Sequence, residues 1–268
     1  MRSRASASLA LGFVALASVA RAQSPDSASA PADPHAAQPE RPTVATHAGT
    51  VAPGWVEIEA GVEHDDLHGA HALLTPTVLK FGIAPRLQIE LIGSFQHFSG
   101  TIPDYSGIGD IGAALKWRVL EHAPVVGDLA LQPSLKFPTG SAVHGTGTGT
   151  TDVGLLLISS HDWGGYALDL NAGYTRRSGD GSRAPKDATL WTVSSGGPVY
   201  KKLGWVAECY GLPRTTGLAG EEGIVAFLTG PTLEVEKWLV LDAGAIFPLT
   251  GAQPHALYAG LTWNIGKL

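Results

Sequence analysis

The chain ends in Leu257-Tyr258-Ala259-Gly260-Leu261-Thr262-Trp263-Asn264-Ile265-Gly266-Lys267-Leu268, and this stretch decides the fold. Its apolar residues occupy alternate positions, so in an extended chain they share one face while small and polar residues share the other. A length of roughly ten residues is what a tilted strand needs to cross a hydrocarbon layer. A strand at a chain end leaves an unpaired edge, and within a membrane only closure onto the first strand satisfies it.

The same period of two extends outward over the rest of the chain from Trp55. Alternation of this kind is typical of amphipathic β-strands. We therefore predict an all-β protein with about twelve strands, in the segments 55–63, 73–83, 87–96, 110–119, 129–137, 153–159, 166–174, 188–196, 203–211, 224–235, 239–247 and 257–266.

The connections between these strands alternate in length. The long, polar ones are residues 64–70, 99–106, 138–151, 176–187, 212–220 and 248–255, and the shorter ones are 84–86, 121–127, 162–165, 197–202 and 236–238. Long outer loops alternating with short periplasmic turns, together with an even strand count, are typical of outer-membrane barrels. We expect a transmembrane antiparallel up-and-down β-barrel over residues 54–268, in the outer membrane of a Gram-negative bacterium. The alternative is a soluble β-sandwich whose aromatic residues fill the core.

Composition agrees with many short strands joined by turns. The 268 residues include 34 glycines and 18 prolines, only 16% are charged, and the mean hydropathy is +0.10. A net charge of −6 excludes the basic surface typical of nucleic-acid binding. Cys209 is the single cysteine, so no internal disulfide is available to stabilise the chain.

The N-terminal region divides into two parts. Residues 1–22 have a positive start, an apolar run and a small-residue pattern at Ala20-Arg21-Ala22, which together predict a secretory signal peptide. The alternative, a membrane anchor, requires a longer apolar run. Residues 23–53 are rich in Pro, Ala, Ser and Thr and show no periodicity, so we predict a disordered periplasmic linker.

Several segments also resemble a known family. Lys80-Phe81-Gly82-Ile83, Arg86-Leu87-Gln88-Ile89-Glu90 and the stretch from Leu131 to Gly140 are similar to the outer-membrane transporter family of the meta (MetA) pathway of phenol degradation. The similarity extends over about residues 54–268. It implies a bacterial outer-membrane β-barrel that passes small compounds, aromatic ones among them.

Charged residues gather on the face of the strands opposite the apolar one. A charge at the centre of a strand costs several kcal/mol when it faces lipid, so these side chains must line a lumen. They are Glu57, Glu59, Lys80, Glu90, Asp110, Lys116, Arg118, Lys136, Asp169, Glu208 and Asp242. They form either a charged pore lining that selects solutes or a mutually paired network that plugs the barrel. Because the cations come from early strands, we further expect basic and acidic groups to lie on opposite sides of the lumen.

The sequence gives little indication of metal binding or of enzymatic activity. The histidines and carboxylates from His64 to His71 are close enough in sequence to bind a metal, but a solvated loop is the favoured interpretation, and we expect no metal site and no cofactor. No Gly-x-Ser-x-Gly motif is present, so we expect no enzymatic activity. The leading hypothesis is a passive channel for small-molecule solutes, with outer-membrane lipid and the outer-membrane assembly machinery as partners. A structural or adhesive barrel and a barrel-embedded lipid hydrolase are the alternatives.

Overall fold

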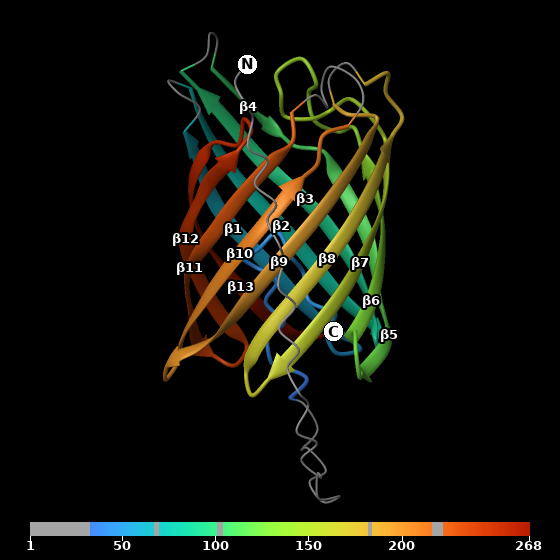
Figure 1. Cartoon of the computed structure of the whole chain (residues 1–268), viewed down its shortest axis with the longest axis vertical. Coiled ribbons are helices and arrows are strands. Elements are labelled where there is room, and N and C mark those ends of the chain that lie inside the picture. The colour runs from blue at the N-terminus through green and yellow to red at the C-terminus, as the bar shows by residue number, and fades with distance from the viewer. Residues whose placement is uncertain (1–32, 67–69, 101–103, 182–183, 216–221) are drawn as a thin grey trace, which may run out of the picture. The chain divides into compact units, whose positions relative to one another are not determined.

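The computed structural model describes residues 33–66, 70–100, 104–181, 184–215 and 222–268. These residues form strands and loops, without a helix among them, and the all-β prediction is confirmed. The strands, coloured along the chain in Figure 1, are β1 (Trp55–Asp66), β2 (His71–Ala84), β3 (Leu87–Ser99), β4 (Tyr105–Ile108), β5 (Ile111–Ala123), β6 (Gly127–Phe137), β7 (Asp152–Trp163), β8 (Tyr166–Arg177), β9 (Asp187–Tyr200), β10 (Leu203–Leu212), β11 (Ile224–Glu236), β12 (Leu239–Thr250) and β13 (His255–Lys267).

The sheet closes into a barrel because its first and last strands pair. β1 and β13 run antiparallel from Trp55 opposite Lys267 to Asp66 opposite His255. β4 and β5 both pair with β3 and are separated by Gly109 and Asp110, so they form one interrupted strand of the wall. The thirteen strand segments of the described chain therefore make twelve wall strands, which confirms the predicted barrel. Closure satisfies the terminal edge that a membrane would otherwise leave unpaired.

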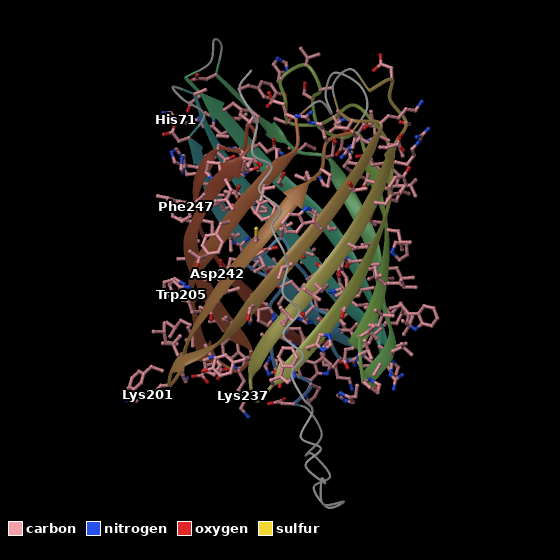
Figure 2. All side chains as sticks on the ribbon, viewed as in Figure 1. His71, Lys201, Trp205, Lys237, Asp242 and Phe247 are labelled. Carbon is pink, nitrogen blue, oxygen red and sulfur yellow. The ribbon has the colours of Figure 1, made fainter. Side chains whose placement is uncertain are left out.

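The connections alternate in length around the barrel. The two-residue turns lie at the end that carries the C-terminus, where Figure 2 labels Lys201 and Lys237. Arg86 and Lys201 adopt positive φ values of 66° and 51° there, a backbone conformation that is found in tight turns. The longer connections, which include the described residues 138–151 and 213–215, lie at the opposite end.

Side chains alternate across the wall in the predicted register. Leu91, Phe95 and Trp205 are 45–48% exposed and face outward, whereas Gln88 and Glu90 are at most 2% exposed and face the lumen. In Figure 2, Trp205 and Phe247 lie on the outer side of the wall. A soluble sandwich would bury its apolar face, so the apolar outer surface identifies a lipid-exposed barrel.

Residues 33–53 correct one sequence prediction. This segment is not a disordered periplasmic linker but lies inside the barrel, in the half nearer the short turns (Figure 1), where Ala45, Ala48 and Val51 are at most 2% exposed. The segment lacks periodicity because side chains of the wall, and not a neighbouring strand, satisfy its backbone.

The predicted signal peptide, residues 1–22, and the first part of the predicted linker, residues 23–32, lie outside the described residues. So do residues 67–69 of the histidine-rich stretch, which include His68, and residues 101–103, 182–183 and 216–221 of the long connections. No helix within the described ranges is both long and apolar enough to span a membrane.

Candidate functional site

The lumen is occupied by residues 33–53, which we call the lumen segment. The segment runs around the inner wall, and side chains of five strands, β1, β3, β7, β8 and β10, accept hydrogen bonds from its backbone amides. These bonds are Gln38 N to Glu57 Oε2 (2.7 Å), Glu40 N to Glu59 Oε1 (2.6 Å), Val44 N and Ala45 N to Glu208 (2.8 Å each), Thr46 N to Asn171 Oδ1 (2.8 Å), Ala48 N to Ser160 Oγ (2.8 Å) and Val51 N to Gln88 Oε1 (2.7 Å). An irregular backbone buried in a barrel needs such partners, because unsatisfied amides are costly.

Two lysines of the wall meet a glutamate of the lumen segment. Lys80 Nζ lies 3.3 Å from Glu40, 3.2 Å from Glu57 and 2.8 Å from Glu59. Lys116 Nζ pairs with Glu40 and donates to Thr46 Oγ1 at 2.8 Å. Both lysine side chains are at most 1% exposed. A buried cation is tolerated only when it is paired and hydrogen-bonded, so these contacts fix the lysines and the segment together.

Arg41 forms the segment's second ionic contact. Its Nε and Nη2 donate to the two carboxylate oxygens of Asp242 at 3.2 and 3.1 Å. The guanidinium rests against Gly61 of β1 and Gly260 of β13, which are directly opposite each other in the register. A Cβ at either glycine would come within 2.5 Å of the guanidinium. Two facing glycines therefore make the space that the arginine occupies.

Packing and stacking hold the segment at other points. Ala48 packs with Ala130 and Ile158 in an apolar cluster. At the end of the barrel with the short turns, the His35 ring lies 4.9 Å from that of Trp55 and 5.9 Å from that of Trp238. The His47 Nδ1 accepts from Gly49 N at 2.9 Å. Burial lowers the pKa of His47, and the neutral imidazole provides this acceptor.

A separate charged cluster lies towards the long loops. Lys136 Nζ is 2.5 Å from Asp110 and 3.2 Å from Asp152, and Arg177 Nε is 3.2 Å from Asp152. Asp110 also accepts the backbone amides of Gly140 (3.1 Å) and Thr148 (3.0 Å). Asp110 thus ties the connection between β6 and β7 to the wall, and Thr139 of the same connection adds a bond to Gly109 O at 3.0 Å.

Open space remains inside the barrel on both sides of these contacts. A cavity of about 540 Å³ borders the lumen segment and is lined by Arg41, His47, Ser160 and Asp169 among others. A second cavity of about 270 Å³ is lined by small and apolar inward residues such as Ile92, Leu156 and Leu190, together with Arg177. Each cavity can accommodate a small molecule or several waters.

The predicted lumen residues divide into three groups. Glu57, Glu59, Lys80, Glu90, Lys116, Glu208 and Asp242 are buried around the lumen segment, Asp169 borders its cavity, and Asp110 and Lys136 form the cluster near the long loops. Arg118 lies near the short turns, paired with Asp128 at 3.3 Å. The predicted separation of basic and acidic sides holds only in part. Lys80, Lys116 and Lys136 lie on β2, β5 and β6, and Glu208 and Asp242 lie on β10 and β12, but each lysine also pairs with an acid that is close to it in the wall. Whether these residues select solutes stays a prediction.

Sequence reasoning missed Glu40 and Arg41 and the neutral side chains that hold the segment. Asn171 accepts from Thr46 N and donates its Nδ2 to Thr46 O at 2.9 Å, and Asn264 Nδ2 donates to Ala36 O at 3.3 Å. One signal was available: Glu208 and Asp242 face inward on strands whose predicted faces offer no cation. Such carboxylates need donors from elsewhere in the chain.

The described residues contain no group of three or more His, Cys, Asp or Glu side chains placed to hold a metal ion. His64 and His71 stack with ring centroids 5.4 Å apart at the ends of β1 and β2. Cys209 is a free thiol on the outward face of β10, as its parity predicts.

Comparison with solved structures identifies an outer-membrane protein that shares this fold. An outer membrane channel from Pseudomonas putida F1 superposes with a TM-score of 0.62 at 15% identity, over 81% of this chain and 97% of that chain. The translocator domain of the autotransporter NalP from Neisseria meningitidis has a TM-score of 0.45 at 11% identity, over 82% of this chain and 90% of that chain. No protein-family profile matches the chain, and no curated protein matches it. The closed twelve-stranded barrel with its apolar outer face is an outer-membrane β-barrel, and its location is the bacterial outer membrane.

Proposed function

We propose that the protein is an outer-membrane channel for small molecules, aromatic compounds among them, and that the lumen segment is its internal plug. The observation that supports this is how the segment is held. Its backbone amides bond to single side chains of the wall, and no ladder of backbone bonds ties it to a strand. A hydrogen bond to a neutral side chain contributes about 0.5–1.5 kcal/mol net, and one to a carboxylate such as that of Glu208 about 1.5–3 kcal/mol. Departure of the segment would break these bonds, the ion pairs of Glu40 and Arg41 and the backbone bond from Ala37 N to Lys237 O, but no pairing between strands.

The wall under the plug suggests which solutes pass. Four carboxylates, those of Glu57, Glu59, Glu208 and Asp242, and two lysines of the described wall contact the segment directly. When the segment leaves, the bared wall carries more acids than bases. Rings of acidic side chains favour cations in channels. We therefore expect the open channel to prefer cationic and neutral solutes over anions.

Recording of single channels in planar bilayers tests this function. The full-length parent is expected to be closed for most of the time. The double variant Glu208→Ala/Asn171→Ala removes the acceptors of three segment amides and leaves every strand pairing intact, so it should open more often and prefer cations. The control is Ser134→Ala, an inward residue of β6 that lines the cavity of about 270 Å³, which no residue of the segment lines. In liposomes, benzylamine should enter through the variant faster than benzoate.

A structural barrel without conductance is the second candidate, because Lys80 and Lys116 are buried in the paired network that such a barrel would use as a brace. This alternative predicts no current from the parent or from the double variant. It also predicts a lower unfolding midpoint in the double variant. If neither the parent nor the double variant conducts current, and neither benzylamine nor benzoate enters liposomes, the channel function is rejected.

A further inference from the structure

The contact of Arg41 has the form of a ligand site. Asp242 presents both carboxylate oxygens to the guanidinium, and its side chain is only 2% exposed. Planar two-point recognition is the geometry in which a guanidinium binds a carboxylate best. The Arg41 side chain also lines the cavity of about 540 Å³, so the site adjoins open space in the lumen.

The shape of the site comes from the wall and not from the segment. Gly61 and Gly260 are opposite each other on β1 and β13, and both face the guanidinium. A Cβ on Gly61 would lie 2.4 Å from Arg41 Nη2, and one on Gly260 would lie 2.4 Å from Nε. Glycine weakens a strand interior and is found where another group approaches closely. The two glycines and Asp242, which we call the guanidinium slot, therefore persist when Arg41 leaves.

An empty guanidinium slot would leave a buried carboxylate without its cation. With the rest of the segment in place, removing Arg41 alone is strongly unfavourable, because Asp242 stays buried and its charge is neither solvated nor compensated. When the whole segment leaves, Asp242 faces the lumen as an uncompensated charge. Lys80 cannot replace Arg41, since Glu57 and Glu59 belong to the wall and still hold it when the segment leaves. The slot therefore has a physical preference for a cation from the lumen.

We infer that the guanidinium slot is a binding subsite for solutes that carry a guanidinium group, and that Arg41 occupies it as an internal stand-in for such a solute. As a subsite on a transport path, this inference rests on the proposed function, in which the lumen segment leaves the wall. Solute and segment then compete for Asp242, and a guanidinium solute favours the open state.

Binding to the full-length Arg41→Ala variant tests the slot directly. Methylguanidinium at millimolar concentrations, far below those that unfold proteins, should raise the thermal midpoint of Arg41→Ala saturably and leave the parent unchanged, because the parent's slot is filled. Methylurea has nearly the same shape without the charge, and tetramethylammonium has the charge without the planar donors. Neither should act.

Two matched variants locate the effect. Arg41→Ala/Asp242→Asn lacks the charged acceptor and should show no shift. Arg41→Ala/Gly260→Ala places a methyl group in the slot and should weaken the apparent affinity at least about tenfold. If Arg41→Ala does not fold in buffer alone, refolding yield with methylguanidinium replaces the midpoint as the readout, with the same two variants as controls. No response in Arg41→Ala, or an equal response in Arg41→Ala/Asp242→Asn, overturns the inference.

These experiments test the guanidinium slot and the channel function independently, so one can be rejected while the other is supported. A saturable shift in Arg41→Ala with silent bilayers would support the guanidinium slot and reject the channel. Current in the Glu208→Ala/Asn171→Ala variant that methylguanidinium does not alter, together with no shift in Arg41→Ala, would keep the channel and reject the slot.

Discussion

The side chain of Lys80 shows how far a single residue follows from sequence. Its inward direction follows from the period of two along β2, because a charge facing lipid is excluded. Its partner Glu40 could not be predicted, since that residue lies in an irregular segment whose place depends on the closed barrel. Parity identifies the face of a residue, whereas its contacts require the tertiary structure.

Lys80→Met should destabilise the barrel strongly. The change keeps the volume of the side chain but leaves Glu57 and Glu59 buried beside an apolar group. Breaking a buried pair in this way costs about 3–5 kcal/mol. Denaturant titration of the protein in lipid measures the loss. Lys201→Met, at an exposed turn, is the control, and similar losses in the two variants would contradict a buried network.

At the scale of elements, the sequence predicted which segments form strands more accurately than it predicted where each strand ends. β1 continues to Asp66 and β8 to Arg177, beyond the predicted ends at Glu63 and Tyr174. The strands extend past the apolar band there, where alternation no longer separates apolar from polar residues. Backbone pairing with β2 and β9 continues regardless of side-chain type.

A mid-strand outward position should not tolerate charge. Leu157 lies in the middle of β7 and faces lipid. Leu157→Arg should cost about 2–4 kcal/mol of unfolding free energy near the membrane midplane. Leu157→Ala, which loses apolar area without adding charge, should cost less. Unfolding in vesicles measures both, and equal costs would speak against lipid at this face.

The composition of the lumen segment led to a wrong prediction, that of a disordered linker. Proline, alanine and threonine without periodicity are typical of disorder, and here the same residues fit a path whose donors meet fixed acceptors of the wall. The acidic excess of the inward faces was the usable signal, because it required donors that the strands themselves did not supply.

Thiol labelling distinguishes an inserted segment from a free one. In a Cys209→Ser background, Val51→Cys should react slowly with a charged maleimide, because Val51 is 0% exposed, whereas Val125→Cys should react fast, because Val125 is 85% exposed. Adding Glu208→Ala/Asn171→Ala should accelerate Val51→Cys. Equal labelling rates for Val51→Cys and Val125→Cys in the absence of Glu208→Ala/Asn171→Ala would favour the original prediction of a disordered linker.

At the scale of the whole molecule, the outer-membrane barrel was predicted from two features: closure of the last strand onto the first, and the alternation of long and short connections. Pairing of β1 with β13 places the beginning of the barrel wall and its end side by side, so an even number of strands returns the chain to the same end. That end also carries the short turns. The interior could not be predicted equally well, because a barrel of this size lies between those filled by side chains and those that hold a channel.

The orientation of the barrel in the membrane follows from the same asymmetry. Outer-membrane barrels place short turns in the periplasm and longer loops outside the cell. Val143, in the connection between β6 and β7, is 80% exposed and lies at the long-loop end, while Lys201 lies at the other end. A short epitope inserted after Val143 should bind antibody on intact cells, and the same epitope after Lys201 should bind only after the outer membrane is permeabilised. Both insertions lie outside the strands, so neither disturbs a paired residue. Binding at Lys201 on intact cells would mean that the barrel is inverted and that the lumen segment lies near the cell surface.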